Sequence, residues 1–288
     1  MKRETVTGYT VWIFMGILLC GTAVVFAQEE VEQKEKKAAD LSVQQIVDQA
    51  NWASYYKGKD GRAKVTMDII DSQGRKRNRE FTILRRDEPA PEDAKDEKYC
   101  GDQKFYVYFS RPADVSKMVF MVWKHVDKDD DRWLYMPALD LVKRVAASDK
   151  RTSFVGSHFF YEDVSGRGVD EDKHELVETT DNYYVLKNTP KKPGEVEFAW
   201  YKMWIHKKSF LPVKTEYYDS NGKAYRRYTV TKVEDLQGFQ TVTGSVMEDL
   251  KSGGKTEMTY ESVKYNLGIP EDIFTERYLR RAPRKYLR

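Results

Sequence analysis

The chain has 288 residues, of which 33% are charged and 40% are hydrophobic, and its 49 basic residues nearly balance 46 acidic ones. This length and composition suit a globular chain that buries a sizeable core as one domain. The balanced charge provides no overall field to attract nucleic acid, so no nucleic-acid partner is expected.

The N-terminus has the pattern of a secretory signal peptide. Lys2 and Arg3 precede an apolar run over residues 11–27, and Gln28 begins a polar stretch. Residues 1–27 are therefore expected to be removed on export. An uncleaved membrane anchor is the alternative, because the apolar run approaches the length of the shortest membrane span.

The rest of the chain is expected to form a leader and one monomeric domain. Residues 28–40 are charged and lack apolar periodicity, which is typical of a flexible leader. The domain is expected over residues 41–288. Cleavage would leave Cys100 as the only cysteine, and one cysteine cannot form an internal disulfide. Lipidation of Cys20 is not expected, because Leu19 stands where a lipoprotein signal needs a small residue.

The clearest helix is expected over residues 41–56. Ser42 is a plausible N-cap, and Gln45 follows three residues later, as in a capping box. Gly58 and Gly61 come after the helix and would end it. One face of this helix carries an apolar stripe. The stripe consists of Val43, Ile46, Val47 and Ala50.

From residue 62 onward the pattern changes to strands. Apolar and polar residues alternate in many short runs, and Asn221-Gly222 is typical of a hairpin turn. Strands at such short spacing predict one antiparallel sheet or open barrel. Strands are expected at residues 63–69, 81–84, 104–109, 119–125, 133–136, 141–145, 183–187, 197–205, 212–218, 224–233, 240–248 and 256–265.

Two segments interrupt the strands. Residues 86–102 are charged and contain prolines, so they are expected to form an exposed loop. Residues 146–168 do not alternate cleanly, and they are expected to cross the open face of the sheet with a short helix near residues 157–164.

The densest motif lies at residues 131–163. It reads W-L-Y-M-P-A-L from Trp133, and V-K-R-V, S-F-V-G-S and F-F-Y-E-D follow, ending at Asp163. The motif is rich in aromatic residues but has no nucleophile paired with a base, no metal-ligand spacing and no phosphate-binding loop. It therefore indicates that the protein holds an apolar molecule rather than transforming it.

These ordered pieces resemble the LolA-like outer-membrane lipoprotein-sorting family, and His158 departs from the family pattern. The resemblance implies a mainly β fold: a curved, unclosed antiparallel β-barrel whose concave side is covered by the N-terminal helix and a short helical lid. It also implies a periplasmic carrier that binds the acyl chains of lipoproteins or other envelope lipids in an apolar cup.

The same resemblance implies two membrane partners. An inner-membrane exporter would load the carrier, with an RND-type transporter as the first candidate, and an outer-membrane acceptor would receive the lipid. An anchored periplasmic sensor of lipid or envelope stress is the alternative function. A hydrolase acting on envelope lipid is a third.

Aromatic residues in and near the motif are the candidate lipid-binding residues. Cross-strand packing is the competing interpretation of each one. The candidates are Trp123, Trp133, Tyr135, Phe154, Phe159 and Tyr161.

A second set of candidates would tether the lid. Arg144 ends a strand that is expected to face residues 146–168, and Glu162 or Asp163 could bind it. The alternative is a solvated charged face.

No catalytic residue, cofactor or metal site is expected. Ser157 and His158 are adjacent, but no Gly-x-Ser-x-Gly elbow surrounds the serine. The aspartates at residues 127–131 lack the glycine and the carboxylate of an EF-hand loop, and the histidines are scattered. The basic residues at 276–288 suit a frayed tail, or contact with anionic lipid or an acidic membrane partner.

Overall fold

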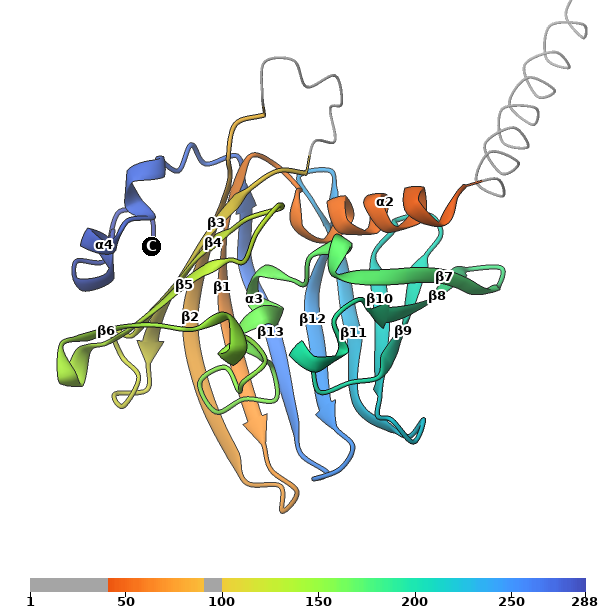
Figure 1. Ribbon diagram of the computed structural model, residues 1–288. Helices are drawn as coiled ribbons and strands as arrows, with labels where there is room; N and C mark the ends of the chain where they lie inside the picture. The colour runs from red at the N-terminus through yellow and green to blue at the C-terminus, as the bar shows by residue number, and fades with distance from the viewer. Residues whose placement is uncertain (1–40, 91–99) are drawn as a thin grey trace, which may run out of the picture. The chain divides into compact units, whose positions relative to one another are not determined.

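The computed structural model describes residues 41–90 and 100–288. The expected signal peptide and leader lie outside the described residues. Residues Val43–Arg288 form one compact unit, which consists of a long antiparallel sheet, a helix and a few short helical turns (Figure 1).

Helix α2 spans Val43–Tyr55, close to the expected bounds. Its apolar stripe faces inward, since Ile46, Val47 and Ala50 are buried. Gly58 follows with a φ of 67°, a left-handed conformation that glycine adopts without strain. The chain then enters β1 at Asp60, so Gly61 belongs to a strand rather than to the end of the helix.

Over residues 41–90 and 100–288, the sheet has thirteen strands. The strands are β1 (Asp60–Ile70), β2 (Lys76–Asp87), β3 (Gln103–Arg111), β4 (Val119–Lys124), β5 (Asp131–Met136), β6 (Leu141–Arg144), β7 (Asp172–Thr179), β8 (Tyr183–Pro190), β9 (Trp200–His206), β10 (Pro212–Tyr218), β11 (Ala224–Leu236), β12 (Phe239–Asp249) and β13 (Lys255–Tyr265).

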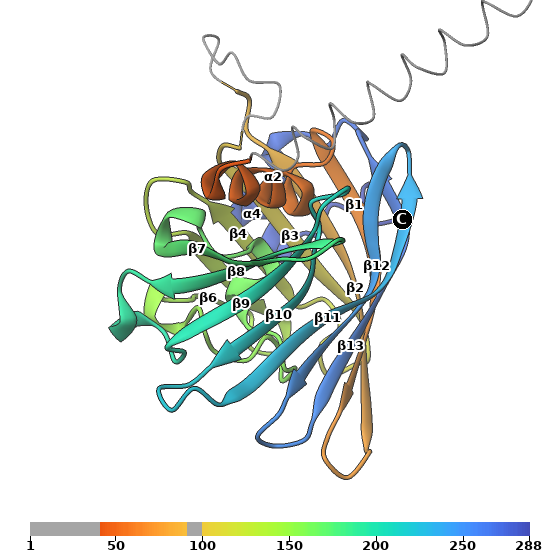
Figure 2. The same ribbon diagram turned by 90° about the vertical axis from the view of Figure 1, so that its right-hand side faces the viewer.

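The strand order is β6-β5-β4-β3-β2-β1-β13-β12-β11-β10-β9-β8-β7, so only β1 and β13 are neighbours far apart in sequence. Every strand pairs antiparallel with its neighbours. β6 and β7 lie at the two edges and the sheet does not close, although it curves around α2 (Figure 2). The predicted fold class, a mainly β, unclosed antiparallel barrel with an N-terminal helix, is confirmed.

The two faces of the sheet carry separate apolar clusters. The inner face, which lies toward α2 and residues 146–168, includes Val65, Met67 and Phe120. The outer face includes Tyr106, Met121 and Trp133. Because β4 is apolar on both faces, its sequence V-F-M-V-W-K does not reveal which face a given side chain occupies.

Residues 146–168, called the lid segment below, hold a short hairpin and the helix α3 (Tyr161–Ser165). The hairpin is closed by the bridge between Ser153 and Phe160, and the amide of Phe154 donates to the carbonyl of Phe159 at 2.8 Å. The short helix expected near residues 157–164 is therefore present, a few residues later in the chain.

The C-terminal residues pack on the outer face, so the expected frayed tail is wrong. Ile269, Ile273 and Phe274 are buried, and Leu279 in helix α4 (Glu276–Arg280) is 1% exposed. The hydroxyl of Tyr106 on β3 donates to the carbonyl of Tyr278 at 2.7 Å. Apolar residues between the arginines are the physical reason: they cover an outer face that is itself apolar.

Candidate functional site: a covered apolar cavity

A cavity of about 420 Å³ lies between α2, the lid segment and the inner face of the sheet. Its volume falls in the usual range for small-molecule sites. Val47, Ala50 and Ala53 line it from α2, and they are the residues that the helix turns inward. Strands β2, β8, β9, β12 and β13 supply further apolar surface. This surface includes Ile83, Leu186, Met203, Ile205, Met247 and Met258.

The lid segment covers the cavity with two phenylalanines. Phe154 is 1% exposed, and its ring centroid lies 5.7 Å from that of Phe109 and 5.6 Å from that of Phe120. Phe159 lies 6.4 Å from the ring of Tyr228 on β11. Both phenylalanines line the cavity. Phe154 is thus part of the core and of the cavity wall at once.

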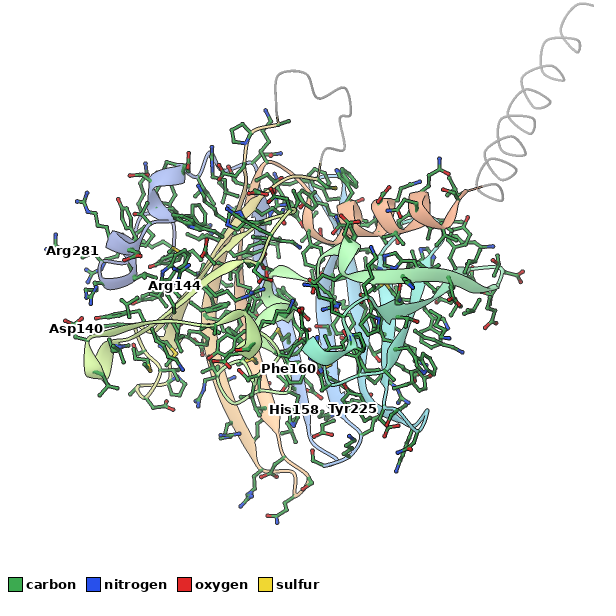
Figure 3. The ribbon with its side chains drawn as sticks, viewed as in Figure 1. Asp140, Arg144, His158, Phe160, Tyr225 and Arg281 are labelled. Atoms are coloured by element: carbon green, nitrogen blue, oxygen red, sulfur yellow. The ribbon has the colours of Figure 1, made fainter. Side chains whose placement is uncertain are left out.

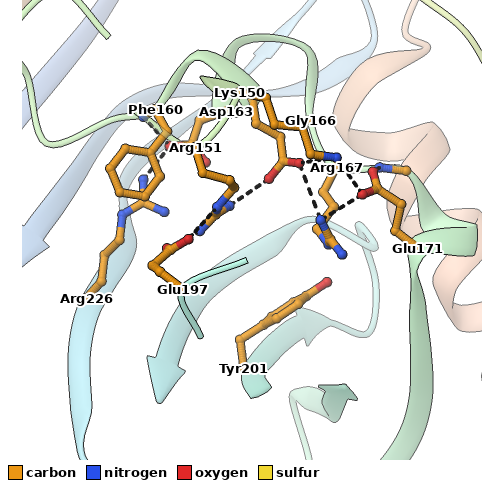
Figure 4. A network of polar contacts seen from close by, with 12 residues as sticks. Lys150, Arg151, Phe160, Asp163, Gly166, Arg167, Glu171, Glu197, Tyr201 and Arg226 are labelled. Carbon is orange, nitrogen blue, oxygen red and sulfur yellow. Dashed lines mark hydrogen bonds and ion pairs between the residues drawn. The ribbon is translucent and has the colours of Figure 1, made fainter. Parts of the chain in front are cut away.

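A buried carboxylate anchors the lid segment. Glu162 is 1% exposed, and its oxygens lie 2.6 Å from Arg151, 3.2 Å from Lys150 and 3.4 Å from Arg167 (Figure 4). Burial by itself raises the pKa of Glu162, but the three cations outweigh burial and lower it to about 2. Glu162 is therefore charged throughout the physiological range.

Two of these cations, Arg151 and Arg167, also bind carboxylates on or near strands β7 and β9. Arg151 donates to both carboxylate oxygens of Glu197, at 2.9 and 2.5 Å. Arg167 donates to Asp172 on β7 at 2.9 Å, and Asp172 accepts from the hydroxyl of Tyr201 on β9. The network therefore joins the lid segment to β7, β9 and the turn before β9.

A second tether lies on β11. Arg226, which is 3% exposed, binds the carboxylate of Asp163 and the carbonyl of His158. Its guanidinium also lies 3.9 Å from the ring centroid of Phe160, and Arg151 lies 4.9 Å from the same centroid. The Phe160 ring is thus held between two guanidinium groups, a cation–π arrangement that adds to the ion pair.

A third tether comes from β4, on the same inner face of the sheet. The ammonium of Lys124 on β4 donates to the carbonyl of Ser165 at 2.7 Å, at the C-terminal end of α3. Burial lowers the pKa of Lys124. A cation at a helix C-terminus complements the carbonyl dipoles there.

The structure separates the predicted lipid-binding residues. Phe154 and Phe159 line the cavity, whereas Tyr161 packs behind Phe154 with ring centroids 5.6 Å apart. The expectation for Trp123, Trp133 and Tyr135 is corrected, because these three belong to the outer-face cluster.

The outer-face tryptophans pack instead against residues 269–288, called the C-terminal segment below. The rings of Trp123 and Trp133 lie 5.0 Å apart, and the indole N–H of Trp123 donates to the carbonyl of Phe274 at 2.7 Å. In β4 and β5 these side chains alternate with Phe120, Val122 and Leu134, which are the ones in the inner cluster.

The predicted tether is also corrected in part. Glu162 and Asp163 form ion pairs with Arg151 and Arg226, respectively, and Arg144 does not bind them. Arg144 pairs with Asp131 and lies over the ring of Trp133 on the outer face. Figure 3 shows Arg144 well apart from Phe160 and His158.

The cations that bind Glu162 and Asp163 were not predicted. Lys150, Arg151, Arg167 and Arg226 are scattered over the chain, and charged residues in loops are usually solvated. One sequence signal was available: K-R at residues 150–151 stands immediately before the phenylalanine hairpin.

Ser157 and His158 have separate hydrogen-bond partners in this arrangement. The imidazole Nδ1 of His158 lies 2.8 Å from the hydroxyl of Thr256, and the Ser157 hydroxyl contacts the backbone of Phe159. Within residues 41–90 and 100–288, no cluster of three His, Cys, Asp or Glu residues is suited to a metal ion. None of the described helices is both long and apolar enough to cross a membrane.

Comparisons with known proteins agree with this architecture. A family model described as "uncharacterized protein" matches residues 101–281. A crystal structure of a DUF1329 family protein from Desulfovibrio piger is 28% identical with a TM-score of 0.71, and the match covers 82% of this chain and 98% of the other. The comparison with curated proteins found no match.

Two further crystal structures share the fold. A putative outer-membrane lipoprotein-sorting protein domain from Vibrio parahaemolyticus is 23% identical with a TM-score of 0.71, covering 82% of this chain and 97% of that one. A LolA superfamily protein from Nitrosomonas europaea is 20% identical with a TM-score of 0.61, covering 83% and 99%. The chain therefore belongs to the family whose model matches residues 101–281, and its fold is that of the LolA-like lipoprotein-sorting proteins.

Proposed function

We propose that the protein is a periplasmic carrier that binds acyl chains of lipoproteins or other envelope lipids in the cavity under α2. The cavity itself is the observation that supports this proposal most directly. It is lined largely by apolar side chains and covered by the lid segment. Each buried methylene contributes about 0.8 kcal/mol, so a carrier of this kind needs no covalent chemistry to hold its cargo.

The lid segment supplies the means of loading and release. Besides the packing of Phe154 and Phe159, ion pairs and cation–π contacts hold it on the sheet, and it is not joined to the sheet as a paired strand. Such contacts can be exchanged for water when a partner binds. An inner-membrane exporter, for which an RND-type transporter is the first candidate, would load the carrier, and an outer-membrane acceptor would empty it.

Export is part of this proposal. The mature chain is expected to begin at Gln28, which N-terminal sequencing of the periplasmic fraction would check. An intact N-terminus in the membrane fraction would favour the anchored sensor, because a shuttle must diffuse between membranes.

Cavity binding is tested with a fluorescent acyl-chain probe. Ala63 lines the cavity from β1, and Ala63→Phe should fill part of it and weaken probe binding about tenfold or more. The neighbouring Lys64 points to the other face of the same strand and is exposed, so Lys64→Phe is the matched control and should leave the affinity unchanged. Equal affinities for both variants and the parent protein would contradict the proposal.

A further inference from the structure

One end of the cavity carries a buried cation. Lys57 follows α2, is 8% exposed and lines the cavity. Its ammonium donates to the carbonyl of Gln240 on β12. Among the residues that the structure describes, no carboxylate forms an ion pair with Lys57. Burial lowers its pKa to about 8, so most of the molecules carry the charge at neutral pH.

The backbone around Lys57 is held in place independently of its ammonium. The guanidinium of Arg85 on β2 donates to the carbonyls of Tyr55, Lys57 and Gly58, the last two at 2.8 and 2.5 Å. These bonds satisfy carbonyls at the end of α2 that would otherwise lack partners. Arg85 in turn is paired with Asp87 at 3.0 Å. Arg85 therefore fixes the backbone position from which the Lys57 side chain extends to the cavity.

The carboxylates elsewhere on the cavity wall already have partners. Glu162 is bound by three cations and Asp163 by Arg226, so neither is free to neutralise Lys57. Near Gln240, the hydroxyls of Thr241 and Tyr265 also line the cavity and lie 2.8 Å apart. This end of the cavity thus offers hydrogen-bonding groups, whereas Ile83, Met247 and Met258 make the interior apolar.

An ammonium group has three donors, and the Gln240 carbonyl takes one of them. Burying a cation without a counter-ion is unfavourable, and a charged partner recovers much of that cost. We propose that the Lys57 end of the cavity is a subsite for one anionic headgroup, a carboxylate or a phosphate, of an amphiphile whose acyl chain fills the apolar interior. This inference rests on the proposed function and specifies its ligand class as acidic single-headgroup lipids.

Competition against the fluorescent acyl probe tests this subsite. Dodecanoate, dodecyl phosphate and methyl dodecanoate have similar chains but differ in headgroup charge. The parent protein should bind one or both anions about tenfold more tightly than the methyl ester, since a charge-assisted hydrogen bond is lost in the ester. Comparing dodecanoate with dodecyl phosphate shows which headgroup the subsite prefers.

Lys57→Met keeps the apolar stem and removes the charge. It should bind the anions and the ester about equally, with the ester affinity within about twofold of the parent, while Lys57→Arg should retain the preference. Lys59→Met, at an exposed position two residues on, is the matched control and should behave like the parent. Thermal unfolding of each variant shows that the fold is kept.

Three results would overturn the inference. A parent protein that binds ester and anions equally contradicts the subsite but leaves the carrier proposal standing. An anion preference that survives in Lys57→Met shows that a group other than Lys57 recognises the headgroup charge. A parent protein that binds none of the three amphiphiles contradicts the carrier proposal and this inference together.

Discussion

At the residue scale, Glu162 is the side chain whose loss should lower the stability of the fold most. A carboxylate with 1% exposure is tolerated only because Lys150, Arg151 and Arg167 surround it. Removing its charge would leave three cations close together with less compensation. The same group that fixes the lid segment is therefore a point of vulnerability for the fold.

Glu162→Gln should destabilise the protein by roughly 3–5 kcal/mol, the usual cost of breaking a buried ion pair. Urea unfolding at neutral pH measures this change. Glu195→Gln is the control, because Glu195 is exposed and pairs with exposed Lys192, and it should change stability by less than about 1 kcal/mol. A Glu162→Gln variant as stable as the parent would contradict the importance of the network.

The pH dependence follows from the direction of the pKa shift. The folded pKa of Glu162, about 2, lies below its ordinary value of 4.5, so the stabilisation is complete above about pH 4.5. It is lost as pH falls from there toward pH 2, because the unfolded chain binds a proton that the folded chain does not. Unfolding measured across this window should show a smaller acid-dependent loss in Glu162→Gln than in the parent.

At the element scale, the lid segment and the C-terminal segment cover opposite faces of the sheet by different means. The lid segment is tied by charged side chains, including Arg226, to a face that also holds the cavity. The C-terminal segment is packed through Ile273, Phe274 and Leu279 onto a closed apolar cluster. We therefore expect the first to open locally and the second to come away only with loss of the fold.

Arg226→Gln tests local opening of the lid segment. The change removes the ion pair with Asp163 and the cation over Phe160, so the amides of residues 153–166 should exchange hydrogen faster. Amides of β1 and β2 should be unaffected. Arg227→Gln removes a half-exposed cation that binds Glu216 and serves as the control. Uniformly faster exchange over the whole sheet would mean that Arg226 supports the fold rather than the lid segment.

Leu279→Asp tests the role of the outer face. A carboxylate in this buried position should cost several kcal/mol of stability, whereas acyl-probe affinity per folded molecule should stay the same. Urea unfolding and probe titration measure the two quantities. Arg281→Asp, at an exposed neighbour, should alter neither strongly. Weakened probe binding in folded Leu279→Asp would place the ligand surface on the outer face, where Trp123 and Trp133 lie.

Much of the fold could be predicted from alternation and turn residues, and the exceptions have physical causes. β7 was not predicted because it is an edge strand with mostly exposed side chains, so it lacks a buried face to mark its period. β4 was predicted, but with both faces apolar its residues could not be assigned to the cavity or to the outer face. The lid's cations were missed because ion pairing between distant segments leaves no spacing signal in the sequence.

At the scale of the whole molecule, an unclosed sheet solves a specific problem for a carrier. Here the sheet does not close, and α2 and the lid segment cover its inner face (Figure 2). In the carrier that we propose, apolar cargo would be hidden from water and reached by moving a short segment. The outer face is covered by the protein's own C-terminal residues, among them Ile273, Phe274 and Leu279.

Native mass spectrometry of the protein purified from its own periplasm shows whether the cavity holds acyl chains. We expect a mass above that of the polypeptide alone, with an acyl-chain lipid released on activation in the gas phase. Ala63→Phe should carry less of this lipid than Lys64→Phe. A bare polypeptide mass for parent and variants alike, with no uptake of added acyl amphiphile, would contradict the account.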